Sequence, residues 1–229
     1  MRRAATIAAV ACAALTAAAS AGATSECRGL KVCVPVTGPW VVAPSTGVEF
    51  QLSCPKRFIV GGLDAELSDR AIDVGFVGGL GSPVNPGVTT TGAAVFMGRF
   101  VGGGARAASF RPHIGCIPAS GGGQRAPTAY HAFTPGKPTF RVVKELTVRL
   151  GLNRTVATCG AGRHLIRATN AVGFYTLTPP TAAVIADLHV RQVVRGERVT
   201  VVARAGPAFR SLAPVAAIIQ LDLVCAVNA

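Results

Sequence analysis

An acidic cluster between residues 64 and 73 is the densest group of side chains suited to acid–base chemistry. Asp64, Glu66, Asp69 and Asp73 fall within this short stretch. Two carboxylates about 5–10 Å apart serve glycoside hydrolysis, and several carboxylate oxygens can hold calcium. The spacing lacks the glycine and the terminal glutamate of calcium loops. The alternative interpretation is an acidic turn with a local Asp69–Arg70 ion pair. Asp64, Asp69 and Asp73 are therefore retained as ligand-site candidates.

The remaining motifs of catalysis and phosphate binding are incomplete. The sequence has no G-x-S-x-G elbow for a nucleophilic serine. Its glycine runs at 102–104 and 121–123 lack the lysine that follows a phosphate-binding loop. Four histidines, His113, His131, His164 and His189, stand in no metal-ligand spacing. We expect no catalytic residue, no metal and no cofactor.

Trp40 is the one tryptophan of the chain, and it follows Gly38-Pro39. An exposed indole ring could stack on a sugar, which makes Trp40 a ligand-binding candidate. The alternative is that the ring anchors a hydrophobic core, where large aromatic side chains are usually found.

The cysteines indicate disulfides rather than a metal site. Beyond Cys12 there are six, which allow 15 pairings, and none forms a C-x-x-C pair. Cys27 and Cys33 lie close together, and the other four form two pairs with similar gaps. The spacing therefore predicts the bridges Cys27–Cys33, Cys54–Cys116 and Cys159–Cys225. Such a framework is typical of proteins outside the cytoplasm.

The N-terminus is typical of a secretory signal peptide. Arg2-Arg3 precedes an apolar run that is too short to span a membrane, and Ala21-Gly22-Ala23 matches an A-x-A cleavage site. We expect residues 1–23 to be a Sec signal, with cleavage near Ala21 or Ala23. No later segment has the length and apolarity of a membrane span, so we expect none in the mature protein.

Basic residues outnumber acidic ones by 23 to 10, which gives a formal net charge of +13. Such a balance attracts polyanions, although arginines also simply solvate the outer faces of strands. There is no lysine-rich run and there are no interleaved aromatic residues for stacking on bases. We therefore expect no specific nucleic-acid binding. The partner stays open, with an anionic cell-envelope polymer as the candidate class.

Two cysteine-bounded segments resemble copies of one unit. Each begins behind a short strand, at 50–54 and 155–159, and closes on a strand that ends in cysteine, at 114–116 and 221–225. Residues 74–76 and 172–174 both read Val-Gly-Phe, and the apolar run 93–101 aligns with 182–190 at equal spacing. We expect a duplication.

Short alternating segments between Gly- and Pro-rich turns predict an all-β protein of two tandem β-sandwich or jelly-roll units. The expected order is a signal peptide (1–23), a cysteine-clipped segment (24–43), a first β unit (44–118), a Gly/Pro/Ser linker (119–138) and a second β unit (139–229). The sequence leaves open whether the two units pack as one domain or as two.

Residues 27–35, 38–41, 60–65 and 81–87 carry a resemblance to a family. These segments resemble a group of uncharacterised secreted, disulfide-containing β-proteins of actinobacteria. The second unit is similar to a looser pattern of exported bacterial domains that end in Val-Cys-Ala, here at 224–226. The resemblance implies export and a β fold, and it implies no activity.

The function expected from these features is that of a non-catalytic secreted protein. It would act as an extracellular binding or structural module, with an anionic cell-envelope polymer as the ligand class. Two alternatives stay open: a secreted hydrolase that uses a glycosidase-type carboxylate pair within 64–73, and an inhibitor of extracellular proteases.

Overall fold

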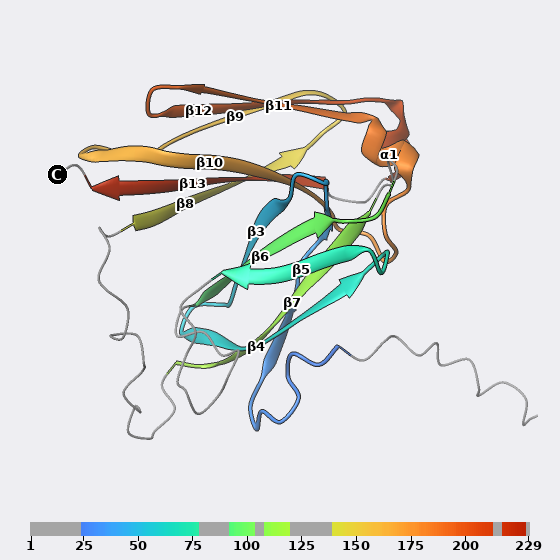
Figure 1. Cartoon of the computed structure of the whole chain (residues 1–229), viewed down its shortest axis with the longest axis vertical. Helices are drawn as coiled ribbons and strands as arrows, with labels where there is room; N and C mark the ends of the chain where they lie inside the picture. Colours follow the sequence, from blue (N-terminus) through green and yellow to red (C-terminus); the bar gives the residue numbers. More distant parts are fainter. Residues whose placement is uncertain (1–23, 78–91, 104–107, 120–138, 213–216, 228–229) are drawn as a thin grey trace, which may run out of the picture.

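β-strands form most of the part of the protein that the structure describes, as Figure 1 shows. The computed structural model describes residues 24–77, 92–103, 108–119, 139–212 and 217–227. Apart from thirteen strands, these residues contain the short helix α1 (Ala182–Ala186) and the 3-10 helix η2 (Pro207–Leu212). No helix of the described residues is long and apolar enough to cross a membrane. The expected all-β class is confirmed. The expected signal peptide and all but the first residue of the expected linker lie outside the described residues.

A seven-stranded antiparallel sheet, the central sheet, runs through both predicted units. Its strands are, in spatial order, β4 (Phe58–Leu67), β7 (Ser109–Pro118), β1 (Val34–Thr37) together with β2 (Trp40–Val42), β10 (Arg163–Phe174), β13 (Ala217–Val227) and β8 (Thr139–Val148). The short strand β2 pairs with β7 through Val41 and Val42 and with β10 through Trp40 and Val41. Strands of the two predicted units therefore share one sheet.

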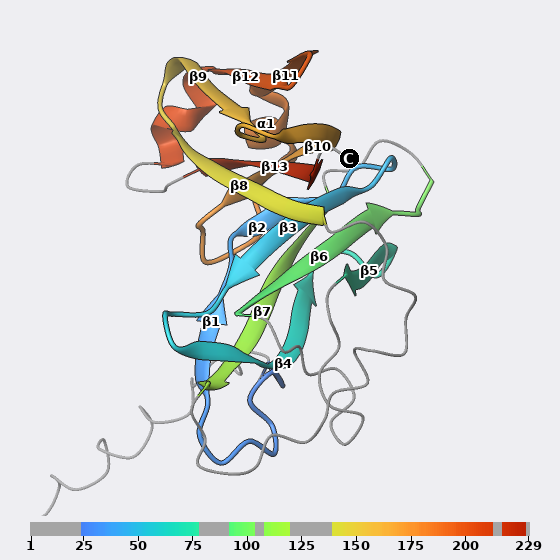
Figure 2. The same ribbon diagram turned by 90° about the vertical axis from the view of Figure 1, so that its left-hand side faces the viewer.

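Two three-stranded sheets cover opposite faces of the central sheet, so that the protein has three layers (Figures 1 and 2). The β3 sheet consists of β3 (Val48–Ser53), β6 (Ala93–Phe100) and β5 (Ile72–Val77). The β12 sheet consists of β11 (Leu188–Arg195), β12 (Arg198–Ala205) and β9 (Gly151–Thr158).

Alternation along β13 places one hydrophobic core on each face of the central sheet. Ile219 and Leu221 point into the core under the β12 sheet, with Val199 and Val201 of β12. Ile218, on the other face of β13, belongs to the core under the β3 sheet. Because both faces of β13 are covered, almost its whole length is buried.

Gln220 connects β13 to β3, which is an edge strand of its sheet. The Gln220 amide accepts a hydrogen bond from the Gln51 backbone N–H at 2.6 Å and donates one to the Gln51 carbonyl at 2.9 Å. It also donates to Glu145 at 3.1 Å. Gln220 is 1% exposed, so its amide satisfies backbone groups of β3 that would otherwise be buried without partners.

Three disulfides have the pairings that the cysteine spacing predicts: Cys27–Cys33, Cys54–Cys116 and Cys159–Cys225. Cys54 follows β3 and Cys116 lies in β7, and in the same way Cys159 follows β9 and Cys225 lies in β13. Each long bridge therefore joins a three-stranded sheet to the central sheet. Disulfides of this kind fit an oxidising environment.

Two of the segment matches expected from the sequence are wrong as structural equivalents. Residues 93–100 form strand β6, whereas the aligned run contains helix α1 and only then enters β11. Val74-Gly75-Phe76 lies in β5 of a three-stranded sheet, whereas Val172-Gly173-Phe174 lies in β10 of the central sheet. A short apolar run does not by itself distinguish a strand from a helix.

Candidate functional site

Asp64 and Glu66 project from the side of β4 that faces away from the β3 sheet, beside His113 of β7. Asp64 accepts hydrogen bonds from Ser25, from the backbone N–H at 2.5 Å and from Oγ at 3.1 Å, and another from the Ala65 N–H. Burial alone would raise the pKa of Asp64, but these hydrogen bonds and the nearby His113 outweigh it and lower that pKa. Its carboxylate thus holds the N-terminal segment in place.

His113 is 3% exposed and lies between two side chains of neighbouring strands. Its Nδ1 is 3.2 Å from Thr37 Oγ1, and its Nε2 is 3.3 Å from Glu66 Oε1. Glu66 also lies 3.9 Å from Arg111. A general base must reach its substrate, and the burial of His113 keeps the imidazole away from one.

Trp40 lies inside the protein and is 4% exposed. On one side of its ring the Arg111 guanidinium lies 5.8 Å from the ring centre. The structure therefore places Trp40 where the face of its ring is covered by protein, as the core-anchor interpretation requires.

Asp69 and Asp73 lie apart from the Asp64–Glu66 pair. Asp69 accepts a hydrogen bond from the Ala71 N–H at 2.8 Å in the turn between β4 and β5. Asp73 lies in β5 and pairs with Arg99 at 3.7 Å, with both side chains well exposed. The four carboxylates thus have separate partners. In the part of the chain that the structure describes, no group of three or more His, Cys, Asp or Glu side chains is arranged to hold a metal ion.

A cleft of about 440 Å³ opens between the β3 sheet and β10. Its polar lining includes Thr46, Glu49, Asp73, Arg99, Arg167 and Asn170. Glu49, whose side chain is 11% exposed, accepts hydrogen bonds from Arg167 at 2.7 and 2.9 Å. It also accepts one from Arg141 at 2.6 Å, and Arg141 in turn binds Asp222.

This ion network joins strands of different sheets, because Glu49 comes from β3 while Arg141, Arg167 and Asp222 come from the central sheet. Burial raises the pKa of Asp222, although Arg141 acts to lower it. The charges along this side of the cleft therefore compensate one another.

The outward side of the β12 sheet carries a different set of charges. In β12 the residues Val199, Val201 and Ala203 are buried against the core, and strand alternation therefore turns Arg198, Thr200, Val202 and Arg204 outward. The register of β11 and β9 with β12 fixes which of their residues share that side. We call this side the basic face. Its five arginines are Arg154, Arg191, Arg195, Arg198 and Arg204.

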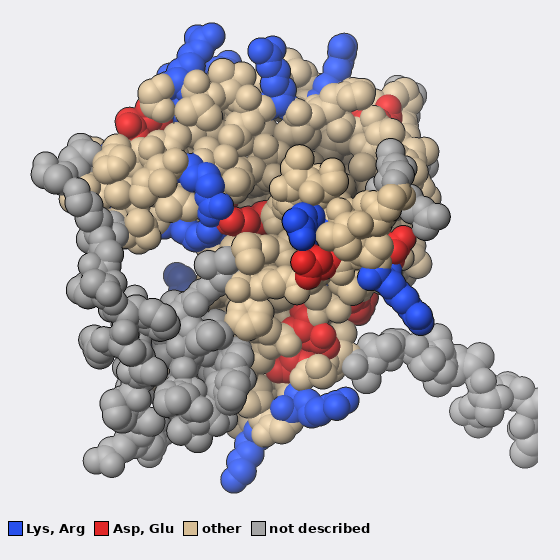
Figure 3. Space-filling model, viewed as in Figure 1, with Lys and Arg blue, Asp and Glu red and all other residues tan. Residues whose placement is uncertain are grey.

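The arginines of the basic face are close together. Arg195 and Arg198 are directly paired across the β11–β12 hairpin, which places their Cα atoms about 5 Å apart. Arg191 and Arg154 both flank Val202, one from each side, and are about 10 Å apart at the backbone. All five are exposed. Figure 3 shows Lys and Arg side chains projecting from the upper end of the molecule, where the β12 sheet lies.

The basic face carries its charge without compensation. None of its arginines forms an ion pair with a carboxylate of the described residues. Glu197, in the turn of the hairpin, accepts a hydrogen bond from the Leu165 N–H of β10 instead. The outward positions of the three strands hold Arg, His, Val, Leu and Thr, and none holds an acid.

The sequence alone does not predict the basic face. The signal that was available is parity: Arg191 and Arg195 both have odd numbers, and Arg198 and Arg204 both have even numbers. Residues of one parity share a face of a strand. Arg154 could be added only once the pairing of β9 with β12 was known.

Comparison of the chain with protein-family models, with curated proteins and with solved structures found no match in any of the three.

Proposed function

We propose that the protein is a non-catalytic secreted module that binds an anionic polymer of the cell envelope through its basic face. The observation that carries this proposal is the set of five exposed arginines on one sheet face without a carboxylate partner among the described residues. Like charges directly opposite one another destabilise a sheet, as with Arg195 and Arg198. A bound anion would relieve that repulsion.

The shape of the basic face favours a chain-like ligand. Eight-residue strands span about 27 Å, and three strands span about 10 Å between the outer backbones. The arginines are spread over both dimensions, so a polymer with repeated negative charges would meet several of them at once. Guanidinium groups bind phosphate and carboxylate groups in a bidentate manner. Exposed Leu152 and half-buried Val156, Val193 and Val202 lie among the arginines and add apolar contact area.

The architecture supports an extracellular role. Three disulfides fit an oxidising location, and a Sec signal at residues 1–23 would deliver the chain there. The fold is consistent with two duplicated sandwich-like units. Each half contributes one three-stranded sheet of the same sequential pattern, β3–β6–β5 and β9–β12–β11, and each has a long disulfide at the same place. Such a body presents the basic face on a rigid support.

A charge-matched pair of variants tests the proposal. The triple variant Arg191→Gln, Arg195→Gln, Arg204→Gln removes three charges from the basic face. The control Lys31→Gln, Lys56→Gln, Arg70→Gln removes three exposed charges elsewhere. Long-chain inorganic polyphosphate serves as the probe, and binding is measured by anisotropy over a range of salt concentrations.

The face variant should bind about 3- to 150-fold more weakly at low salt, because each of the three exposed charge pairs contributes about 0.2–1 kcal/mol. In nucleic-acid binding, each phosphate that a protein neutralises contributes about 0.7–0.9 to the slope of log affinity against log salt concentration. On this basis the slope of the face variant should be shallower by that amount for each phosphate it no longer neutralises. The control should retain nearly wild-type binding. Equal weakening in both variants would mean that net charge alone drives binding, and absence of binding by the wild type would end the proposal.

A further inference from the structure

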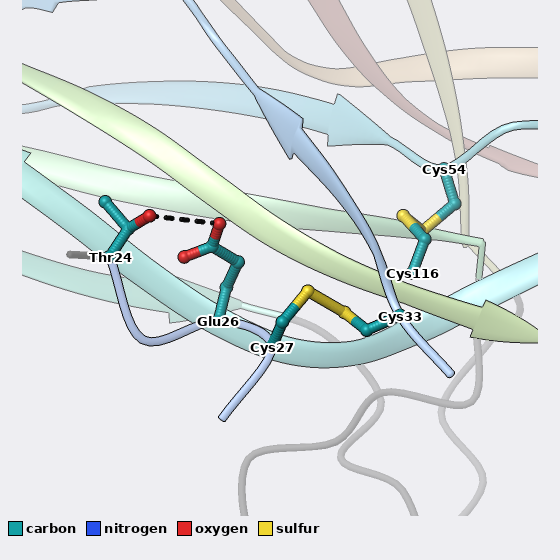
Figure 4. The surroundings of a disulfide bond; sticks show 6 residues. All are labelled: Thr24, Glu26, Cys27, Cys33, Cys54 and Cys116. Carbon is teal, nitrogen blue, oxygen red and sulfur yellow. Dashed lines mark hydrogen bonds between the residues drawn. A yellow bond between two sulfur atoms is a disulfide. The ribbon is translucent and has the colours of Figure 1, made fainter. Parts of the chain in front are cut away.

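Glu26 is a buried carboxylate beside the Cys27–Cys33 disulfide, as Figure 4 shows. The residue is 5% exposed. One oxygen, Oε1, accepts a hydrogen bond from Thr24 Oγ1 at 3.1 Å. The other, Oε2, is buried and has no hydrogen-bond partner among the described residues. A buried carboxylate oxygen without a hydrogen-bond partner destabilises the fold. This points to a cationic or hydrogen-bond-donating partner that is missing.

The segment around Glu26 is held firmly against the central sheet. Ser25 donates to Asp64 through both its backbone N–H and its hydroxyl. The Glu26 carbonyl rests on Gly62 and Gly115, where added Cβ atoms would come within 1.8 and 2.2 Å of it. Thr24 is therefore fixed next to the Glu26 carboxylate by contacts on its C-terminal side.

We propose that export processing cuts the Ala23–Thr24 bond and that the new α-ammonium group of Thr24 is the partner of Glu26. In the cut, a membrane-bound signal peptidase uses water to hydrolyse the amide. Ala23 leaves with the new carboxylate, and Thr24 keeps the nitrogen, which takes up protons to become an ammonium group at neutral pH.

Thr24 is well placed to supply that group. Within one threonine, three covalent bonds join the nitrogen to Oγ1, and Oγ1 already contacts the Glu26 carboxylate. The alternative cut after Ala21 leaves a neutral peptide N–H at Thr24, which has one hydrogen and no charge. Cleavage after Ala23 thus gives the unpaired Glu26 carboxylate an ion-pair partner. The ion pair would stabilise the segment that the Cys27–Cys33 disulfide closes. This inference rests on the expected export and is independent of polymer binding.

The processing site is tested by intact mass and N-terminal sequencing of the protein secreted into a culture medium. The expected chain begins at Thr24 and carries three disulfides. A chain that begins at Gly22 would overturn the assignment. A chain that keeps its first 23 residues would overturn the expected export as well.

The ion pair is tested on the oxidised chain prepared with Thr24 or with Gly22 as its first residue. The readout is the rate at which a small thiol reduces Cys27–Cys33, followed by alkylation and mass spectrometry. The Thr24 chain should be reduced about tenfold or more slowly, as expected for loss of a charged hydrogen bond. In both chains Glu26→Gln should abolish the difference, and the control Glu66→Gln should preserve it. Equal rates for the two starting chains, or a difference that survives Glu26→Gln, would refute the pairing.

Discussion

Arg141 bridges the two carboxylates of the ion network, and its loss should destabilise the protein in a pH-dependent way. The guanidinium binds Asp222, which is 2% exposed, and Glu49, which keeps Arg167 as a second partner. In Arg141→Met the main cost therefore falls on Asp222, whose Oδ1 already has no partner among the described residues. Removing one partner of a buried ion pair costs about 3–5 kcal/mol. Because Arg141 is partly exposed, we expect about 3 kcal/mol at pH 7.

The sign of the pH dependence follows from Asp222. Burial raises its pKa in the folded protein, and Arg141 is one of the groups that act to lower it. When the pKa of a carboxyl is higher in the folded than in the unfolded protein, its protonation stabilises the fold. This stabilisation is complete below the unfolded pKa of about 3.9 and is lost as the pH rises through the folded pKa. Without Arg141 the pKa of Asp222 rises further. The variant should therefore lose more stability than the wild type between about pH 4 and pH 7.

Urea unfolding at pH 4 and at pH 7, followed by tryptophan fluorescence, measures both quantities. The difference between Arg141→Met and wild type should shrink from about 3 kcal/mol at pH 7 to about 1 kcal/mol at pH 4, where only the missing Arg141–Glu49 hydrogen bond still counts. Adding Asp222→Asn to the variant should recover about 2 kcal/mol at pH 7. The exposed Arg191→Met serves as control and should change stability by less than about 0.5 kcal/mol. The same destabilisation at both pH values would refute the role assigned to Asp222.

Two further changes test contacts between the layers. Gln220→Leu should lower the free energy of unfolding by about 2–4 kcal/mol, because it leaves the buried N–H and carbonyl of Gln51 without partners. Urea unfolding measures this loss, and a loss below about 1 kcal/mol would mean that water replaces the amide. Joint replacement of Cys159 and Cys225 by alanine should cost about 4 kcal/mol and that of Cys27 and Cys33 about 2 kcal/mol, because the closed loops span 66 and 6 residues. Thermal unfolding of the two variants in parallel checks the order, and a reversed order would contradict it.

The strands and the disulfides were predictable because alternation is a local pattern and the cysteine pairing follows from the spacing of the cysteines along the chain. Alternation of apolar and polar residues marks β8 and β12 directly, and Gly196, with a φ of +55°, closes the β11–β12 hairpin. Similar gaps between cysteines select one of fifteen pairings. The sharing of one sheet by the two halves was not predictable, because it depends on β2, a three-residue strand whose second neighbour, β10, is remote in sequence.

The candidate site could be predicted less well than the fold. Asp64 and Asp73 are close in sequence, but the turn between β4 and β5, which contains Asp69, places them in different sheets. Trp40 could be a platform or an anchor until its burial was known. The basic face needs the register of three strands, and register between β9 and β12 is a long-range property that spacing along the chain does not contain.

The two three-stranded sheets also explain why the basic face lies on the second half of the chain. In the β3 sheet the residues that point away from its own core include Glu49 and Gln51, and the second half covers both. Arg141 and Arg167 bind the first, and Gln220 binds the backbone of the other. These positions are therefore committed to holding the layers together. The equivalent side of the β12 sheet has no described element against it, so its positions are free to carry Arg191, Arg198 and the other arginines. The proposed polymer would therefore meet uncovered, unpaired arginines on the β12 sheet, whereas the exposed charges of the β3 sheet, Asp73 and Arg99, are paired with each other.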